Sequence, residues 1–214
     1  MDALQALQIA CDAAYAYQTL EAKFSKVPGY LQPMEGFCLY WLGKNWPVHG
    51  ANLEVGSFKG RSTSWFAAGC KAGNRGKVHA VDHFAGSPEH QIGKEFQDED
   101  IVRLGSTLPA FKENLTRNEL LNEVEIRVGK SMDAVRGWDK PIRMIFIDGD
   151  HSYEESKKDF DAWSEFVVPS GLVLFHDINV WPGVTKFFQE LTAPNDVWRQ
   201  VGQILSIAIV QRMQ

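Results

Sequence analysis

The stretch from Met144 to Asp177 constrains the fold more than any other part of this sequence. It begins and ends with short, continuous apolar runs, Met144–Ile147 and Leu172–Phe175. Such runs are typical of strands that are buried on both faces of a parallel sheet. A carboxylate follows each run, Asp148 after the first and Asp177 after the second. Because ligands bind outside the carboxyl ends of the strands in an open α/β sheet, we expect both carboxylates at the rim of a ligand site.

The segment between these two runs has the signals of a crossover helix. Ser152 and Glu155 have the spacing of a capping box, which predicts that the helix begins after Ser152. Its predicted buried side carries Phe160, Trp163 and Val167. Pro169 and Gly171 are predicted to end the helix and to start the next strand. We therefore expect a strand, a helix and a second, parallel strand.

Strand and helix signals alternate along the rest of the chain. The other expected strands are Ala51–Gly56, Lys77–Asp82 and Glu123–Gly129, followed by a closing hairpin of Val197–Val201 and Ile204–Gln211 joined by Gly202 and Gln203. The expected helices are Asp2–Leu20, Met34–Leu42, Ser62–Cys70, Leu108–Leu121 and one that begins near Trp181. This alternation predicts the α/β class, a Rossmann-like doubly wound parallel sheet with one antiparallel strand. We expect the second helix to cover a cofactor cleft, and the first to pack on the domain or on a partner subunit.

Length and composition indicate one domain. With 214 residues, 44% of them hydrophobic, the chain suits one large core, and we expect residues 1–45 to form a helical cover on a core of residues 46–214. Lys and Arg are scattered and the formal net charge is −5, which argues against nucleic acid as a partner. The beginning of the chain lacks the basic start and the long apolar core of a signal or anchor. We therefore expect a cytoplasmic protein that does not bind membranes.

The first predicted strand leads into a glycine-containing turn, Glu54-Val-Gly-Ser-Phe-Lys-Gly60, that opens a helix. At such a turn backbone N–H groups and a helix N-terminus meet a nucleotide-like ligand, and Gly56 permits its close approach. Asp82, at the end of the second predicted strand, can accept hydrogen bonds from two ribose hydroxyls. These features suit NAD or S-adenosylmethionine, although the glycine spacing departs from the dinucleotide fingerprint. A tight turn without a ligand is the alternative interpretation.

The order of these motifs resembles that of the class I S-adenosylmethionine-dependent methyltransferases, specifically their small, metal-dependent O-methyltransferases. The catechol O-methyltransferase type is matched at Glu54-x-Gly56-x-x-x-Gly60-x-Ser62, at Gly129-Lys-Ser131, and at Asp148 and Asp177. The macrocin O-methyltransferase and cephalosporin-hydroxylase-like group is matched more closely, at Ile147-Asp-Gly-Asp150 and Phe175-His-Asp177. The resemblance spans about Met34 to Arg212 and implies the strand order 3-2-1-4-5-7-6, with strand 7 antiparallel.

The resemblance also implies an S-adenosylmethionine site. Asp82 would hold the ribose and the Ser131 region the adenine, and His83 follows Asp82 where it can touch the adenosine. The full set of expected cofactor residues is Glu54, Gly56, Ser57, Gly60, Ser62, Asp82, His83, Gly129, Ser131, Met132 and Asp148.

The same resemblance makes Asp148 and Asp177 the expected ligands of a divalent cation, Mg²⁺ or Mn²⁺. Ile178 departs from the catechol type, which has Asn there, and His176 departs from the macrocin type, which has an acid. We include His176 as a third expected ligand, whose nitrogen would favour Mn²⁺, Fe²⁺ or Zn²⁺, with packing or a supporting role as its alternative. Because consecutive strand residues face opposite ways, His176 and Asp177 reach one ion only if the strand has ended.

The expected proton acceptor is Asp150, the second acid of the macrocin-type motif, with His151 as the alternative. Either could instead only order the turn before Ser152. The predicted reaction is methyl transfer from S-adenosylmethionine to a hydroxyl of a small molecule or sugar. The alternatives are a metal-independent methyltransferase, a non-catalytic adenosine-ligand binding protein of the same fold, and an NAD-dependent oxidoreductase. We expect the long loop His83–Leu104 to select the acceptor, and a homo-oligomer remains open.

Overall fold

Seven strands form one sheet in the computed structural model, which describes residues 2–214. The strands are β1 (Ala51–Val55), β2 (Val78–Asp82), β3 (Val124–Val128), β4 (Ile142–Ile147), β5 (Val167–Phe175), β6 (Trp198–Ile204) and β7 (Ile207–Arg212). Their order is β3-β2-β1-β4-β5-β7-β6. The pairs among β1 to β5 are parallel, and β7 runs antiparallel to both β5 and β6. The predicted class, strand order and antiparallel strand are therefore confirmed.

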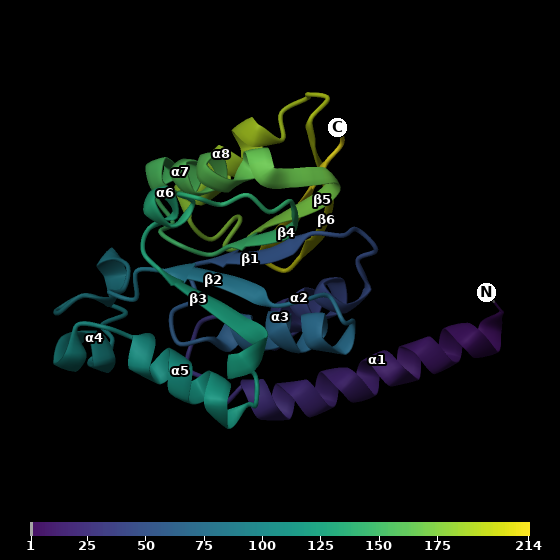
Figure 1. Cartoon of the computed structure of the whole chain (residues 1–214), viewed down its shortest axis with the longest axis horizontal. Coiled ribbons are helices and arrows are strands. Elements are labelled where there is room, and N and C mark those ends of the chain that lie inside the picture. The colour runs from purple at the N-terminus through teal and green to yellow at the C-terminus, as the bar shows by residue number, and fades with distance from the viewer. Residues whose placement is uncertain (1) are drawn as a thin grey trace.

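Helices cover both faces of the sheet (Figure 1). They are α1 (Ala3–Phe24), α2 (Pro33–Asn45), α3 (Arg61–Ala72), α4 (Glu99–Leu104), α5 (Leu108–Arg117), α6 (Ser131–Ala134), α7 (Tyr153–Trp163) and α8 (Pro182–Leu191), with short 3₁₀ turns at Pro88–His90, Leu121–Glu123 and Ser164–Phe166. In Figure 1 α6, α7 and α8 lie above the sheet, and α2, α3 and α5 lie below it.

The continuous apolar runs of β4 and β5 follow from this layering. Met144 and Phe146 lie in the core between the sheet and helices α2 and α3. Ile145 and Ile147 lie in the core on the other face, between the sheet and helices α7 and α8. Successive side chains of a strand point to opposite faces, so a central strand with helices on both sides needs apolar residues at every position. The sheet thus fixes the carboxyl ends of β4 and β5, at which the predicted carboxylates lie.

Two helices differ from their predicted roles. The N-terminal part of α1 projects from the rest of the molecule, with Leu4 78% and Tyr15 73% exposed, and only the C-terminal part of the helix packs on the core (Figure 1). Packing on the domain thus holds for the C-terminal part of α1, and packing of the exposed part on a partner subunit stays a prediction. Helix α2 does not cover the cleft but crosses α3, so closely that a Cβ on Gly69 would lie 2.2 Å from the carbonyl oxygen of Tyr40. Its apolar residues belong to this helix contact, and the segment Pro28–Leu31 before it lines the cleft instead.

Two predicted boundaries also differ. Val167, predicted on the crossover helix, begins β5, because α7 ends at Trp163 and a 3₁₀ turn follows. Pro169 has no N–H to donate to a sheet, and it lies in the part of β5 where the register of the β4–β5 pairing shifts. In the closing hairpin the turn lies at Leu205 and Ser206, not at Gly202, which instead sits at the register shift of β6. Glycine within a strand often marks such a bulge. Within residues 2–214 we find no helix with the length and apolar character needed to cross a membrane.

Candidate functional site

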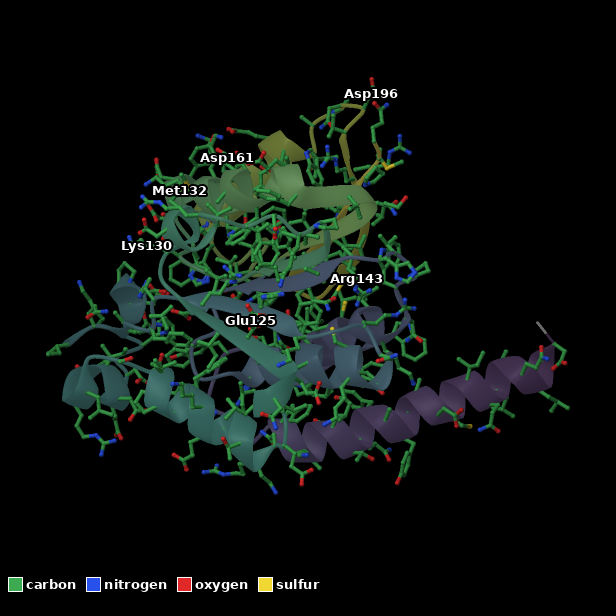
Figure 2. The ribbon with its side chains drawn as sticks, viewed as in Figure 1. Glu125, Lys130, Met132, Arg143, Asp161 and Asp196 are labelled. Atoms are coloured by element: carbon green, nitrogen blue, oxygen red, sulfur yellow. The ribbon has the colours of Figure 1, made fainter. Side chains whose placement is uncertain are left out.

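A cleft of about 1020 Å³ lies at the carboxyl ends of β1, β2, β4 and β5. This is the edge at which ligands bind in open α/β sheets. Most predicted site residues line it: Gly56, Ser57, Ser62, Asp82, His83, Gly129, Ser131, Asp148, Asp150, His151, His176 and Asp177. Three predicted cofactor residues are not among the lining residues: Glu54, Gly60 and Met132. Met132 is 54% exposed on α6, at the outer surface (Figure 2).

The glycine-containing turn after β1 is shaped by two close approaches. Gly56 has φ +84°, and a Cβ there would lie 2.1 Å from the carbonyl oxygen of Asp148, so only glycine fits where β1 meets the end of β4. Gly60 has φ +89° and precedes α3, which begins at Arg61. Gly60 therefore allows the left-handed backbone at the start of α3, and it does not line the cleft.

Two acids hold this turn in place. The carboxylate of Asp82 accepts hydrogen bonds from the backbone N–H groups of Ser57 and Phe58, both at 2.8 Å, and of Phe84 at 2.6 Å. An ionised carboxylate has about four acceptor positions, so Asp82 keeps some capacity for a ligand hydroxyl. Glu54 is fully buried behind the turn, where it accepts hydrogen bonds from the hydroxyls of Ser57 and Thr63. Burial raises the pKa of Glu54 to about 7, although these hydroxyls oppose the shift.

At the β4–β5 end of the cleft, Asp148, His151 and Asp177 form a cluster. Each offers one atom that could bind a metal, and these atoms lie within 4.8 Å of one another. The strand has ended at Phe175, and Asp177 has φ +60°, which turns its carboxylate toward the cluster. Because β5 has ended before His176 and Asp177, these two consecutive residues are not forced to face opposite sides of the sheet.

His151 is the basic member of this cluster. Its Nε2 lies 3.0 Å from Oδ2 of Asp177, and its ring stacks on Trp181 at a centroid distance of 5.0 Å. Its Nδ1 lies 3.4 Å from Oε1 of Glu89, which is close enough for charge attraction but lacks the geometry of a hydrogen bond. Burial disfavours the imidazolium, but Asp177, Glu89 and Asp148 outweigh it and raise the pKa of His151 to about 10.

His176 lies beside the cluster, and its predicted role as a metal ligand stays a prediction. Both ring nitrogens already have carboxylate partners: Nδ1 lies 2.8 Å from Oδ1 of Asp148, and Nε2 lies 3.1 Å from Oε2 of Glu35. The side chain is 4% exposed, and burial is outweighed by Asp148, Glu35 and Asp177, which raise its pKa to about 11. With both ring nitrogens against carboxylates, His176 holds Asp148 in place, which is the supporting role named as its alternative.

Sequence reasoning missed Glu35, which is 1% exposed. Its Oε1 accepts hydrogen bonds from the backbone N–H of Ser206 at 2.9 Å and from its hydroxyl at 2.6 Å. Burial raises the pKa of Glu35, but His176 and Ser206 outweigh burial and lower it to about 2. The only sequence signal was an acid in an otherwise apolar helix, and nothing linked it to a histidine 141 positions away.

The other predicted catalytic residue, Asp150, has a partner of its own. Its Oδ1 accepts a hydrogen bond from the backbone N–H of Ser152 at 2.8 Å, so it does order the turn before α7. Ser152 in turn caps α7 through the N–H of Glu155. Asp150 nevertheless lines the cleft beside Asp148 and His151. The turn-forming role and a role toward a ligand are therefore compatible.

The long loop after β2 closes on the first turn. Lys59, from that turn, is buried and forms ion pairs with Asp98 at 2.6 Å and Asp100 at 2.7 Å. The ring of His90 stacks on Phe58 at a centroid distance of 4.8 Å and on Tyr30 at 5.7 Å. The loop thus contributes an aromatic wall to the cleft, in line with the prediction that it selects the acceptor, although the selection itself stays a prediction.

Comparison with known proteins agrees with this geometry. A family model described as "Methyltransferase domain" matches residues 53–178. The protein y4gI of Sinorhizobium fredii, described as uncharacterized, is 26% identical over 182 residues; the match covers 78% of this chain, which spans only 18% of that protein's length.

Solved structures of several O-methyltransferases have the same fold. One from Bacillus cereus, in complex with S-adenosylhomocysteine, matches with a TM-score of 0.60 at 18% identity, covering 95% of this chain and 91% of that one. TomG from Streptomyces achromogenes, in complex with S-adenosylmethionine, matches with a TM-score of 0.61 at 15% identity, covering 94% and 90%. NovP matches with a TM-score of 0.65 at 19% identity, covering 84% and 78%.

Proposed function

Because the chain belongs to the methyltransferase-domain family, whose model matches residues 53–178, we propose that it transfers the methyl group of S-adenosylmethionine to a hydroxyl of a small molecule or sugar. The observation that carries this proposal is that one cleft brings together the Gly56–Gly60 turn and the cluster of Asp148, His151 and Asp177. The turn suits a nucleoside cofactor, and the cluster suits activation of a hydroxyl. We further propose that the chain acts as one domain.

The cofactor would lie along the turn. Asp82 accepts hydrogen bonds from the ribose hydroxyls while it holds the turn through the N–H groups of Ser57 and Phe58. The Ser131 region receives the adenine. Two solved structures with this fold are complexes with S-adenosylhomocysteine and S-adenosylmethionine, which supports the same cofactor here. The residues at the β4–β5 end of the cleft would then receive the acceptor hydroxyl beside the methyl group.

The cluster has a donor set that fits a divalent cation. Two carboxylates and one imidazole within 4.8 Å suit Mn²⁺, Fe²⁺ or Zn²⁺ better than Mg²⁺, which prefers oxygen ligands. A cation bound there would lower the pKa of the acceptor hydroxyl and stabilise the alkoxide. Asp148, His151 and Asp177 would hold it, and His176 with Glu35 would keep Asp148 in place.

The remaining steps belong to the chain's own side chains. Methyl transfer is an in-line displacement, so the walls of the cleft must align the acceptor oxygen with the methyl carbon and sulfur. Asp150 takes the proton from the acceptor hydroxyl, because His151 as a metal ligand has no free lone pair for it. Trp181 keeps the ring of His151 in its plane by stacking.

A metal-independent methyltransferase is the second candidate, favoured by the ion pairs of the cluster. His151 faces Asp177 and His176 faces Asp148, so the two carboxylates already have positive partners. In that case His151 takes the proton in place of Asp150 only after it has released its own, which a pKa of about 10 places at alkaline pH.

Calorimetry with S-adenosylhomocysteine and with NAD tests the proposed cofactor. We expect S-adenosylhomocysteine to bind and NAD to bind much more weakly, because the turn lacks the dinucleotide spacing. Binding of NAD without binding of S-adenosylhomocysteine would overturn the proposal. Methyl transfer to a hydroxyl acceptor then separates an enzyme from a binding protein of the same fold.

A further inference from the structure

Helix α1 carries apolar side chains on two opposite faces. Leu20 and Phe24 lie on one face and pack on the core of their own domain. Cys11 lies nine residues before Leu20, which is about two and a half turns of helix, and therefore lies on the opposite face. On that opposite face Leu4 is 78% and Leu7 is 60% exposed. Apolar faces of helices are buried in stable proteins, so the second face of α1 needs a partner.

The exposed face has the residue spacing of a helix that pairs with another helix. Leu4, Leu7, Cys11 and Ala14 follow one another at intervals of three and four residues, and all are exposed. An average interval of 3.5 residues is that of the seam between two paired helices. Tyr15, which is 73% exposed, lies beside this seam. These residues form the outer stripe of α1, and their spacing indicates that its partner is also a helix.

The charges around the outer stripe favour a second copy of this chain as that partner. The positions that flank the seam hold Ala3, Gln8, Ala10 and Tyr17, which are all uncharged. In paired helices, ion pairs between flanking residues set the choice of partner, and these residues offer none. Two copies of the outer stripe can therefore meet without repulsion between like charges, although the chain has a formal net charge of −5.

The outer stripe is also symmetric about Cys11. Leu7 and Tyr15 lie four residues before and after Cys11, and Leu4 and Gln18 lie seven residues before and after it. An antiparallel pair with its two-fold axis at Cys11 therefore sets Leu7 of one copy against Tyr15 of the other. The projecting N-terminal part of each helix then lies on the C-terminal part of the other, which its own domain holds in place (Figure 1). Both domains stay outside the helix pair, because each packs on the face of α1 opposite to the outer stripe.

We propose that the outer stripe is the interface of a homodimer, in which α1 pairs in antiparallel orientation with α1 of a second copy. The seam from Leu4 to Gln18 is about 21 Å long at a rise of 1.5 Å per residue. A helix pair of this length buries on the order of 1,000 Å² in total, at the lower end of specific interfaces, which predicts a dissociation constant in the micromolar range. The dimer is independent of the proposed function, because no residue of the outer stripe lines the cleft.

Sedimentation equilibrium of the full chain, from about 1 to 200 µM, tests the dimer. The wild type should pass from monomer to dimer over this range. Leu7→Glu should raise the dissociation constant by roughly 100-fold or more, because it buries a charge without a partner in the seam. Ile9→Glu is the matched control. Ile9 is 47% exposed on the same helix but lies about 200° around it from Leu7, so this variant should dimerise within a few-fold of the wild type.

A cysteine cross-link tests the position of the two-fold axis. Cys11 is exposed, whereas Cys38 and Cys70 are buried, so a short bismaleimide should join Cys11 of one copy to Cys11 of the other. Cys11→Ser should abolish this product. Addition of Leu4→Cys to Cys11→Ser should not restore it, because antiparallel pairing sets the two new cysteines at opposite ends of the seam.

Each result decides the proposal. A wild type that stays monomeric over the whole range overturns it, and so does a Leu7→Glu variant that dimerises like the wild type. Equal loss of the dimer in Ile9→Glu also overturns it, since the interface would then not be the outer stripe. Efficient cross-linking through Leu4→Cys overturns the antiparallel arrangement. The unfolding transition of each variant, measured by circular dichroism, should match that of the wild-type monomer, because Leu7 and Ile9 both lie outside the core.

Discussion

The carboxylates at the two ends of the cleft have different partners. At the β1–β2 end, Asp82 accepts from three backbone N–H groups and Glu54 from two hydroxyls. At the β4–β5 end, Asp148 and Asp177 face histidine rings. A backbone N–H cannot leave its partner without unfolding the turn, whereas an imidazole can release its proton. The hydrogen bonds at the β1–β2 end therefore hold the carboxylates in fixed positions, as a support for a ligand needs. At the β4–β5 end, the charge beside the carboxylates can change when a histidine loses its proton.

The largest effect should come from disabling the second end. Addition of a chelator, or the double substitution Asp148→Asn with Asp177→Asn, should abolish methyl transfer, because the acceptor hydroxyl loses the charge that acidifies it. Binding of S-adenosylhomocysteine should be retained, since the first end is untouched. Turnover assays with added Mn²⁺ or Mg²⁺ measure the recovery. Full turnover in excess chelator would favour the metal-independent candidate.

Next in size is the loss of the proton acceptor. Asp150→Asn should lower kcat by roughly 10²- to 10⁴-fold, as expected of a missing general base, with cofactor affinity intact. The carboxamide keeps an oxygen for the N–H of Ser152, so the turn before α7 should survive. His151→Gln is the informative companion. A near wild-type kcat in Asp150→Asn together with a large loss in His151→Gln would assign the proton to His151.

Substitution at the first end should affect structure and binding together. Asp82→Ala leaves three backbone N–H groups without their acceptor, so we expect the free energy of unfolding to fall by about 1.5 to 3 kcal/mol. Affinity for S-adenosylhomocysteine should fall in the same variant by at least about tenfold. Chemical denaturation and calorimetry on one preparation measure both. A variant of unchanged stability that loses only the cofactor would show that Asp82 does not hold the turn.

The prediction with the smallest expected effect on methyl transfer concerns a buried histidine outside the cleft. His79 is 5% exposed, and burial lowers its pKa to about 4, because its acidic neighbour Glu125 is too exposed to outweigh burial. A lowered pKa in the folded state means that the stabilisation from His79 is complete above pH 6.5 and is lost as the pH falls toward 4. The loss should amount to about 3 kcal/mol, and His79→Gln should remove it from the pH profile of unfolding. An identical profile in the variant would show that buried histidines here do not differ by their partners.

The strands and their ends could be predicted from the sequence, whereas most side-chain contacts of the site could not. The apolar run before Asp148 predicted a central strand because only such a strand needs apolar residues on both faces. The cluster could be predicted as far as its two acids, since strand ends fix them. The pairing of His151 with Asp177 and of His176 with Asp148 could not be predicted, because it depends on the left-handed backbone of Asp177 and on Glu35 of α2. Sequence spacing carries no record of such long-range contacts.

The central claim is that Asp148, His151 and Asp177 at the β4–β5 end hold a divalent cation. Titration of the wild type with Mn²⁺, followed by calorimetry in the presence of S-adenosylhomocysteine, tests it most directly. We expect one cation to bind to the wild type and none to bind at that site in the variant with Asp148→Asn and Asp177→Asn. Asp161→Asn should bind as the wild type does. Absence of binding to the wild type, or equal binding to the double variant, would contradict the account.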